Sequence, residues 1–319
     1  MRWNSIKSVM IAILLVVNVW LIYLLAERGL VQNYFSADAL ENAVEILGRS
    51  GISMTVDQLD PKKRDAAVYG ADMHEDYYAD IAERLAASTV SETFPTPSGV
   101  RMITENRATV SFTHTFGINY LAADGDRTAM RNIVESALAS GEPMEARQRV
   151  LRPLRALLEA YLAEALQTGT AAQSGHARLC FDGVFRFGDY YLFRCSQELD
   201  GKPIDGHRVD CLFDAEGNLL WLDGTWSFLP LTRNYSAQLY DQINILFKEK
   251  AALDEWRMTA QTDDPMTLSR MEFCYVYSVL EDEQTEEKHV YYAPAWQIAY
   301  SDGTVRTYNA VTGESAKIS

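Results

Sequence analysis

Histidines and carboxylates are the side chains of this sequence that could transfer protons or bind a metal ion. The five histidines are scattered, and no two of them have the spacing of a metal site: His74, His114, His176, His207 and His289. Acidic residues crowd around His74, but such clusters usually lie solvated on a loop or an exposed helix face. The sequence has no nucleophile elbow, no glycine-rich phosphate loop and no zinc-protease helix motif. We therefore expect no enzyme activity, no cofactor and no metal ion.

The four cysteines, Cys180, Cys195, Cys211 and Cys274, contain no C-x-x-C pair, so neither a zinc site nor thioredoxin-type chemistry is indicated. If two strands pair across Asp200–Gly206, Cys195 and Cys211 are equidistant from the centre of the turn and could form a disulfide. A disulfide demands strict geometry. We therefore favour the alternative, in which both cysteines are small buried side chains.

An apolar stretch near the N-terminus is expected to anchor the rest of the chain at a membrane. From Ser8 to Ala26 the sequence runs for 19 residues without a charge. About 20 helical residues cross the hydrocarbon core of a membrane, so residues 8–26 are predicted to form a transmembrane helix. Arg2 and Lys7 precede this stretch, which places residues 1–7 in the cytoplasm and the bulk of the chain outside the cell. A cleaved signal peptide is the weaker alternative, because no small-residue cleavage site follows.

Asn18 is the one strongly polar residue of the predicted transmembrane helix. An amide in hydrocarbon is stabilised when it hydrogen-bonds to another helix. Ile11, Leu15 and Ile22 follow the same helical spacing, so these four residues are the candidate contacts with a partner helix. The alternative, in which Asn18 bonds its own backbone, is equally compatible with the sequence.

The composition is that of an ordinary globular protein. The chain has 319 residues, of which 48% are hydrophobic and 23% charged, and its length suits about two domains. The formal net charge of −15 argues against nucleic-acid binding, which requires a positive surface.

Helical and strand patterns alternate after the apolar stretch. The periodicity predicts helices at 37–49 with Ser36 as N-cap, at 77–85, from Arg127, around 151–161 and at 236–256. It predicts strands at 100–104, 108–116, 179–187, 190–197, 209–213, 219–222, 271–280, 290–292, 296–300 and 305–308. Gly188-Asp189 is predicted to form a two-residue hairpin turn, and Asp214–Gly217 another turn. Asp302-Gly303 is predicted to form a type I′ turn between the last two strands.

The predicted fold class is α+β, with helices packed on one face of antiparallel sheets. We expect two extracytoplasmic regions, a first at 27–125 and a second at 126–319. The second region contains a succession of helix, strands, acidic-glycine turn and strand at 145–225 and again at 236–310. This succession suggests a coarse internal repeat of two helix-plus-sheet units.

Several segments resemble a known family. Trp3–Lys7 and the end of the apolar stretch, Asn18–Tyr23, resemble the start of YycI proteins. Tyr292–Ile298 and Asn309–Glu314 are similar to the closing strands of YycI, YycH and PepSY-like domains, and Asp200–Ile204 is similar to a hairpin of those domains. The resemblance covers most of the chain outside residues 57–98, which depart from the family pattern, as do the four cysteines.

The resemblance implies a non-enzymatic membrane protein of Gram-positive bacteria. YycI proteins act with YycH on the YycG (WalK) sensor histidine kinase, which controls cell-wall metabolism. The implied partners are therefore a kinase of this type and a YycH-like protein, reached through the transmembrane helix and the extracytoplasmic domains. Nucleic acid and small-molecule substrates are not expected.

Two other function classes remain open. The first is an anchored PepSY-like module that binds or inhibits a secreted peptidase or a cell-wall component. The second is a wall-modifying enzyme. Loss of a measurable turnover on alanine substitution at Asp182, Asp210 or Asp302 would identify the latter.

Overall fold

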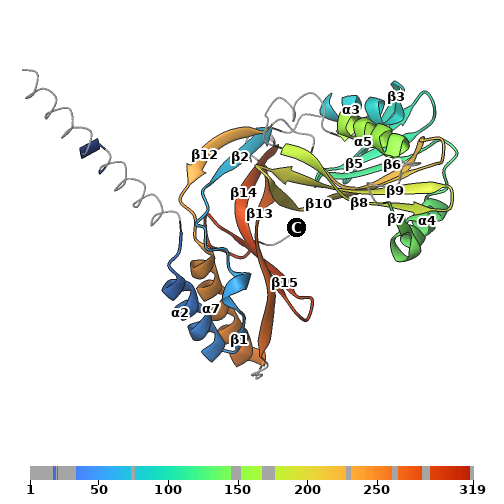
Figure 1. Cartoon of the computed structure of the whole chain (residues 1–319). Coiled ribbons are helices and arrows are strands. Elements are labelled where there is room, and N and C mark those ends of the chain that lie inside the picture. Colours follow the sequence, from blue (N-terminus) through green and yellow to red (C-terminus); the bar gives the residue numbers. More distant parts are fainter. Residues whose placement is uncertain are drawn as a thin grey trace, which may run out of the picture. The chain divides into compact units, whose positions relative to one another are not determined.

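The chain folds into helices and a large mixed β-sheet. The computed structural model describes residues 17–18, 20, 34–72, 76–144, 152–166, 177–227, 231–260, 265–281 and 288–316. This described part contains five α-helices and a sheet of 15 strands (Figure 1). The predicted α+β class is therefore confirmed.

The predicted transmembrane helix lies outside the described residues except at Val17, Asn18 and Trp20, which are helical and exposed. Among the helices that the structure describes, none has the length and apolar character needed to span a membrane.

The chain divides into two compact units, each built from segments distant in sequence. Unit 1 comprises Met1–Ala66, Ser236–Glu272 and Ala295–Ser319, and unit 2 comprises Ala67–Tyr235 and Phe273–Pro294. The boundary expected between residues 125 and 126 falls inside unit 2. It falls there because strand β6 (Gly117–Leu121), before that point, pairs along its whole length with strand β11 (Leu219–Thr225), after it.

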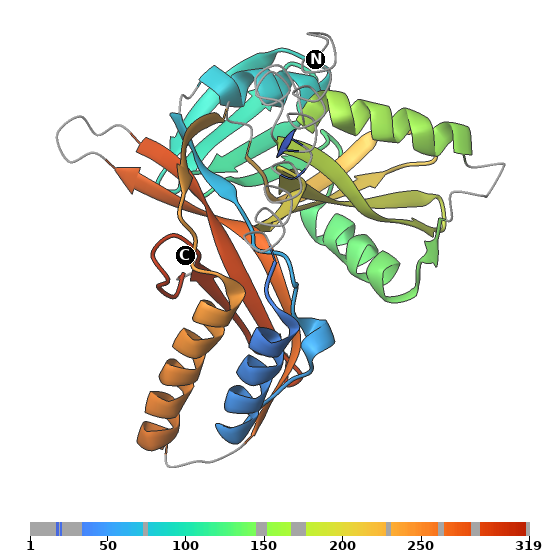
Figure 2. The ribbon, with the colours of Figure 1, turned by 60° about the vertical axis from the view of Figure 1, so that its left-hand side comes forward.

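Two neighbouring helices, α2 (Ala37–Arg49) and α7 (Gln242–Ala260), lie in unit 1 (Figure 2). Helix α2 has the predicted bounds, and the Ser36 side chain accepts a hydrogen bond from the amide of Ala39 at 3.2 Å, as predicted for an N-cap. Helix α7 begins six residues later than predicted. Its first turn is capped by Asp241, which accepts from the amide of Asn244 at 2.9 Å, and the preceding Thr232–Ala237 forms edge strand β12 instead.

Unit 1 is completed by the start of β13 (Met266–Glu281), the end of β14 (Lys288–Tyr300), β15 (Val305–Asn309) and the short strand β1 (Ile52–Ser53), which is paired parallel to β13. The remaining parts of β13 and β14, within Phe273–Pro294, belong to unit 2. Residues 290–292 and 296–300, predicted as two strands, form the single strand β14. Pro294 lies where β14 passes from pairing with β2 (Ala66–Asp72) to pairing with β15, so its missing N–H breaks neither of these two ladders.

The predicted type I′ turn at Asp302-Gly303 is wrong. A type I′ turn needs positive φ at both central residues, whereas only Gly303 has it, at +88°. The amide of Gly303 donates to the carbonyl of Tyr300 at 3.1 Å, so Ser301 and Asp302 form the turn and Gly303 follows in the left-handed region.

Unit 2 is built on a long antiparallel sheet. Its strands follow the order β8 (Ala177–Phe187), β9 (Tyr190–Leu199), β10 (Lys202–Phe213), β11, β6, β5 (Thr109–Thr113), β4 (Gly99–Thr104) and β3 (Val90–Thr96). The predicted hairpin at Gly188-Asp189 is confirmed as the β8–β9 turn. The predicted strand 108–116 ends at Thr113, because the chain turns at Phe116, which has φ of +63°, and returns as β6.

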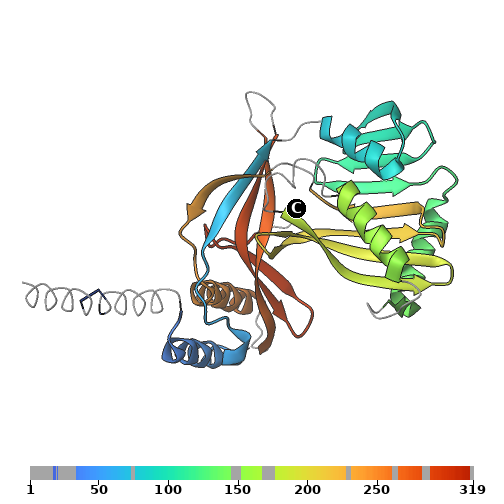
Figure 3. The same cartoon turned by 45° about the horizontal axis from the view of Figure 1, so that its top comes forward.

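Helices cover both faces of this sheet, which corrects the expectation of one covered face. Helices α3 (Asp76–Ala86) and α5 (Arg152–Leu166) pack on one face in a core with Phe193, Phe213 and Leu222. Helix α4 (Arg127–Ser140) packs on the other face (Figures 1 and 3). Its core includes Leu192 and Leu212, which directly precede Phe193 and Phe213 in the sequence. Neighbouring residues of a strand point to opposite faces of the sheet. Because helices cover both faces, both residues of such a pair are buried.

Candidate functional site

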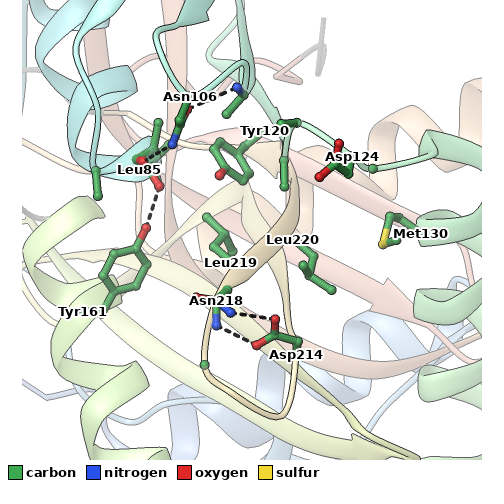
Figure 4. A pocket seen from close by; sticks show the side chains of 17 residues that line it. Leu85, Asn106, Tyr120, Asp124, Met130, Tyr161, Asp214, Asn218, Leu219 and Leu220 are labelled. Carbon is green, nitrogen blue, oxygen red and sulfur yellow. Dashed lines mark hydrogen bonds between the residues drawn. The ribbon is translucent and has the colours of Figure 1, made fainter.

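Unit 2 contains a cavity of about 490 Å³ where three chain reversals meet at one end of the sheet (Figure 4). These reversals are the β4–β5 turn, the loop from β6 to α4 and the β10–β11 turn. The volume is within the usual range of small-molecule sites, about 300–1,000 Å³. The cavity is lined by Leu85, Ala86, Ala87, Asn106, Ala108, Tyr120, Ala122, Ala123, Asp124, Gly125, Met130, Tyr161, Asp214, Gly217, Asn218, Leu219 and Leu220.

The β10–β11 turn forms one wall of the cavity and is held rigid by its own side chains. The two carboxylate oxygens of Asp214 accept hydrogen bonds from the amide and the side-chain nitrogen of Asn218, at 2.7 and 2.8 Å. Gly217 has φ of +89°, which completes the reversal. The predicted turn at Asp214–Gly217 is thus confirmed, and it fixes a carboxylate beside the cavity.

The opposite wall joins helix α3 to the β4–β5 turn and to helix α5. The side-chain oxygen of Asn106 accepts from the Thr104 hydroxyl at 2.6 Å, and its nitrogen donates to the carbonyl of Ala86 at 2.8 Å. The Tyr161 hydroxyl donates to the carbonyl of Leu85 at 2.7 Å. These bonds satisfy carbonyl groups at the C-terminal end of α3, so Asn106 and Tyr161 serve mainly as framework.

Tyr120 differs from these framework residues. Its side chain is 5% exposed, and Figure 4 shows its hydroxyl directed into the cavity, between Leu219 and Tyr161. Within the described part of the chain this hydroxyl makes no hydrogen bond. Burial raises the pKa of Tyr120, so the phenol stays neutral and able to donate or accept. It is therefore the polar group of the cavity that is available to a ligand.

The charges at the cavity are all negative. Asp124 lies exposed at the loop after β6, and Asp214 lies in the wall. The described lining residues include no lysine, arginine or histidine. A cavity of this kind is better suited to a cationic or neutral ligand than to an anionic one.

A second polar cluster of unit 2 surrounds His207, which is fully buried at 2% exposure. The amide of Gln197 is oriented by Ser227, because its nitrogen donates to the Ser227 carbonyl at 2.8 Å and its oxygen accepts from the Ser227 N–H at 3.2 Å. The same oxygen lies 2.9 Å from Nδ1 of His207. An oxygen can only accept, so Nδ1 carries the proton of the imidazole.

Aromatic rings enclose the other side of His207. The ring centroids of Tyr277, Phe116 and Tyr292 lie 4.9, 5.9 and 5.9 Å from that of the imidazole. Nε2 is buried and has no hydrogen-bond partner among the residues described. Burial lowers the pKa of His207 to about 3, so the ring is neutral at physiological pH. The cluster has the character of a buried core contact.

Unit 1 contains a buried carboxylate that the sequence analysis did not identify. Glu249 of α7 is fully buried and accepts hydrogen bonds from the hydroxyls of Tyr300, at 2.6 Å, and of Tyr308. Its other contact is with Arg306, at 3.3 Å. Burial and then the hydrogen bond to Glu249 raise the pKa of both tyrosines. The available signal was the position of Glu249 between Ile245, Leu246 and Leu253, on the buried face of the helix.

Each of the three aspartates considered for catalysis has a structural contact of its own. Asp210 forms a two-point ion pair with Arg194, at 2.9 and 3.0 Å. Asp182 accepts from the Ser196 hydroxyl at 2.7 Å. Asp302 of unit 1 accepts from the amide of the next residue but one at 2.8 Å, in the turn after β14, and this bond lowers its pKa.

All four cysteines are free thiols. The pairing predicted to place Cys195 opposite Cys211 is wrong, because β10 contains an irregularity between Pro203 and Arg208 that shifts the register. Cys195 therefore lies opposite Val209, and Cys211 opposite Phe193. Both cysteines are fully buried, and burial followed by a hydrogen bond between the two thiols raises the pKa of Cys211. They are the small buried side chains that we favoured.

Of the four predicted contacts in the membrane, Asn18 is described, as an exposed helical residue, whereas Ile11, Leu15 and Ile22 lie outside the described residues. The YycI-like segments therefore remain a resemblance of sequence. Comparison of the chain with protein-family models and with curated proteins finds no match.

Proposed function

We propose that this chain is a membrane-anchored, non-enzymatic regulator of a sensor histidine kinase, of the kind that its resemblance to YycI implies. The observation that carries the proposal is the uncharged stretch Ser8–Ala26, which lies ahead of the helices and strands that the structure describes from residue 34 onward. Its length matches the hydrocarbon core of a membrane, and the basic residues ahead of it favour a cytoplasmic N-terminus. Both units would then lie outside the cell.

Regulation by such a helix needs no catalysis. A helix that packs more tightly against one of two states of the kinase shifts the population toward that state by its difference in affinity. A hydrogen bond between Asn18 and the partner helix would contribute about 1 kcal/mol, enough for a roughly fivefold shift. Ile11, Leu15 and Ile22 would supply the packing on the same face. A YycH-like protein would contact the extracytoplasmic units.

The contacts of the acidic residues are compatible with this proposal. Asp210 and Glu249 are held by arginine and tyrosine side chains in closed hydrogen-bonded pairs. Carboxylates in such pairs commonly stabilise a fold, whereas general acids and bases must reach a substrate. The proposal therefore assigns them to stability.

Photo-crosslinking in the membrane tests the proposal. A photoreactive residue placed at position 11, 15, 18 or 22 should capture a sensor histidine kinase, identified by mass spectrometry. Ile13, Val17 and Trp20 lie on the opposite face of an ideal helix and are the matched controls, from which capture should be much weaker. Equal capture from both faces, or none above background, would refute a contact through this helix.

The second candidate function is an anchored binding or inhibitory module, whose target is a secreted peptidase or a cell-wall component. The cavity of unit 2, with the free hydroxyl of Tyr120, favours it. Replacing Ser8–Ala26 with an unrelated membrane span distinguishes the two functions. Regulation through the helix would be lost, as read from genes under kinase control, whereas a module that needs the anchor only for location would keep its activity.

A further inference from the structure

We propose that the cavity lined by Tyr120 is a binding site for a protonated amine carried on a short aliphatic stem. The amine can belong to a small molecule or to a lysine side chain of another protein, because both present the same group. This inference concerns unit 2 alone and does not depend on the membrane helix, so its failure would leave the proposed regulation standing.

The charge of the cavity lining favours a cation. Asp124 and Asp214 are the charged side chains among the described lining residues, and both are acidic. An ammonium group is attracted to this site, whereas a carboxylate or phosphate is repelled.

The Tyr120 hydroxyl favours an amine independently of the acidic residues. The side chain is 5% exposed and its hydroxyl points into the cavity without a partner in the described chain. The hydroxyl oxygen is open to the cavity, so a ligand that enters the cavity can form a hydrogen bond with it. The neutral phenol oxygen can accept a hydrogen bond from an ammonium group, which has three donors and no acceptor. The ring of Tyr161, close by in Figure 4, can add a cation–π contact.

The apolar part of the cavity lining favours an aliphatic stem on the amine. Leu219 is 8% exposed, and Leu220 and Met130 line the cavity from the other side of the strand in Figure 4. An aliphatic stem of a few methylene groups gains about 0.8 kcal/mol for each group it buries there. The cavity of about 490 Å³ has room for such a stem and its ammonium group.

The test follows the methyl group of Met130 by NMR in the full chain carrying ¹³C-methyl methionine. The probes are n-butylammonium, 1-butanol and butyrate, which share size and differ in charge. The Met130 signal should shift with saturation on addition of butylammonium, which should bind at least about tenfold more tightly than either of the others. Met258, an exposed residue of unit 1, is the internal control. Equal binding of butanol or butyrate, or no shift of Met130, would overturn the proposal.

Two variants with matched controls locate the ligand. Tyr120→Phe removes only the hydroxyl and should weaken butylammonium binding about tenfold, and Asp124→Asn should weaken it about threefold and reduce its dependence on salt. Tyr191→Phe removes a tyrosine hydroxyl from a buried position away from the cavity lining, and Asp189→Asn an exposed charge in the β8–β9 turn; neither should change the affinity. If Tyr120→Phe binds like the parent protein, the assigned site is wrong. Asp124 is exposed, so its variant keeps the test decisive even if Tyr120→Phe misfolds.

A capped Gly-Lys-Gly peptide distinguishes the two sources of the amine, with capped Gly-norleucine-Gly as its control. Binding of the lysine peptide at Met130, without binding of the norleucine peptide, assigns the site to a lysine side chain. Binding of butylammonium but not of the lysine peptide assigns it to a small amine. Both results support the amine site. Equal shifts from the lysine and norleucine peptides would show that the charge contributes nothing, and would refute it.

Discussion

The buried His207 makes unit 2 sensitive to acid in a way that can be calculated. The imidazole has a pKa of about 6.5 in an unfolded chain, whereas burial lowers it to about 3 in the folded protein. Between these two values only the unfolded chain binds the proton. The free energy of unfolding is therefore unaffected above about pH 6.5 and falls as the pH is lowered. The fall is about 1.4 kcal/mol per pH unit in the steep part, which amounts to about 2 kcal/mol at pH 5.

The perturbation is His207→Gln. A glutamine amide can donate to the oxygen of Gln197 as Nδ1 of His207 does, at 2.9 Å, but it does not titrate. The variant is less stable than the parent protein at pH 7.5, because the ring contacts with Tyr277 and Phe116 are lost. Its free energy of unfolding should nevertheless fall by about 2 kcal/mol less than that of the parent protein between pH 7.5 and pH 5.

The assay is urea unfolding followed by fluorine NMR of 5-fluorotryptophan, which reports on unit 2 through the buried Trp226. His114→Gln is the matched control for replacing a histidine by glutamine, since His114 is an exposed residue of the same unit. Equal pH dependence of the parent protein and His207→Gln would refute the reasoning. If the variant does not fold, nitrogen NMR of the parent protein still decides, because a protonated His207 ring at pH 5 contradicts it.

Three further substitutions, with Gly188→Ala as a matched control, test the packing. Glu249→Gln removes the charge that holds Arg306 and should lower the free energy of unfolding of unit 1 by about 3 kcal/mol in urea titrations; a loss below about 0.5 kcal/mol would contradict the network. Trp226→Phe loses an indole bond of 3.0 Å to a main-chain carbonyl and should cost about 3 kcal/mol by thermal unfolding, and an unchanged melting temperature would exclude that bond. Gly224→Ala places a Cβ 2.0 Å from a main-chain oxygen and should abolish the native circular dichroism of unit 2. Gly188 has open space around it, so Gly188→Ala should lower the free energy of unfolding by only about 1 kcal/mol. Equal effects of the two substitutions would disprove the clash at Gly224.

Features that depend on near neighbours in the chain could be predicted from the sequence. Helix α2 with its Ser36 cap and the β8–β9 hairpin at Gly188-Asp189 are of this kind. A cap or a two-residue turn is stabilised by groups that lie a few residues apart. Most of the free energy that stabilises it therefore comes from residues close in sequence. The α+β class follows from the same local patterns.

Features that depend on distant segments could not be predicted. The start of α7 was placed too early because Thr232–Ala237 is recruited as an edge strand by β2, far away in sequence. The Cys195–Cys211 register was missed because an irregularity in β10 changes the pairing by an amount that no local rule specifies. The start of α7 and the register of Cys195 and Cys211 both depend on strand pairing, which sequence patterns a few residues long do not specify.

The cavity shows the same limit for the candidate site. Tyr120 lies in strand β6, which is not among the strands predicted from the sequence, and Asp124 and Asp214 lie in turns. Nothing in their spacing relates Tyr120 to a turn more than ninety residues later. They meet because β6 pairs with β11, which places the ends of both strands together. A long-range ladder of this kind gains its free energy from the whole sheet, so no single residue signals it.

By itself, the amino-acid sequence determined the apolar stretch Ser8–Ala26, the acidic charge and local elements such as helix α2 and the β8–β9 hairpin, because these depend on composition and on neighbours within a few turns of chain. Only the tertiary structure decided which carboxylate is buried, at Glu249, and which imidazole is kept neutral, at His207. It also decided that the Tyr120 hydroxyl opens into a cavity. The physical reason is that desolvation and pairing are set by what packs around a side chain, and those surrounding atoms come from every part of the chain.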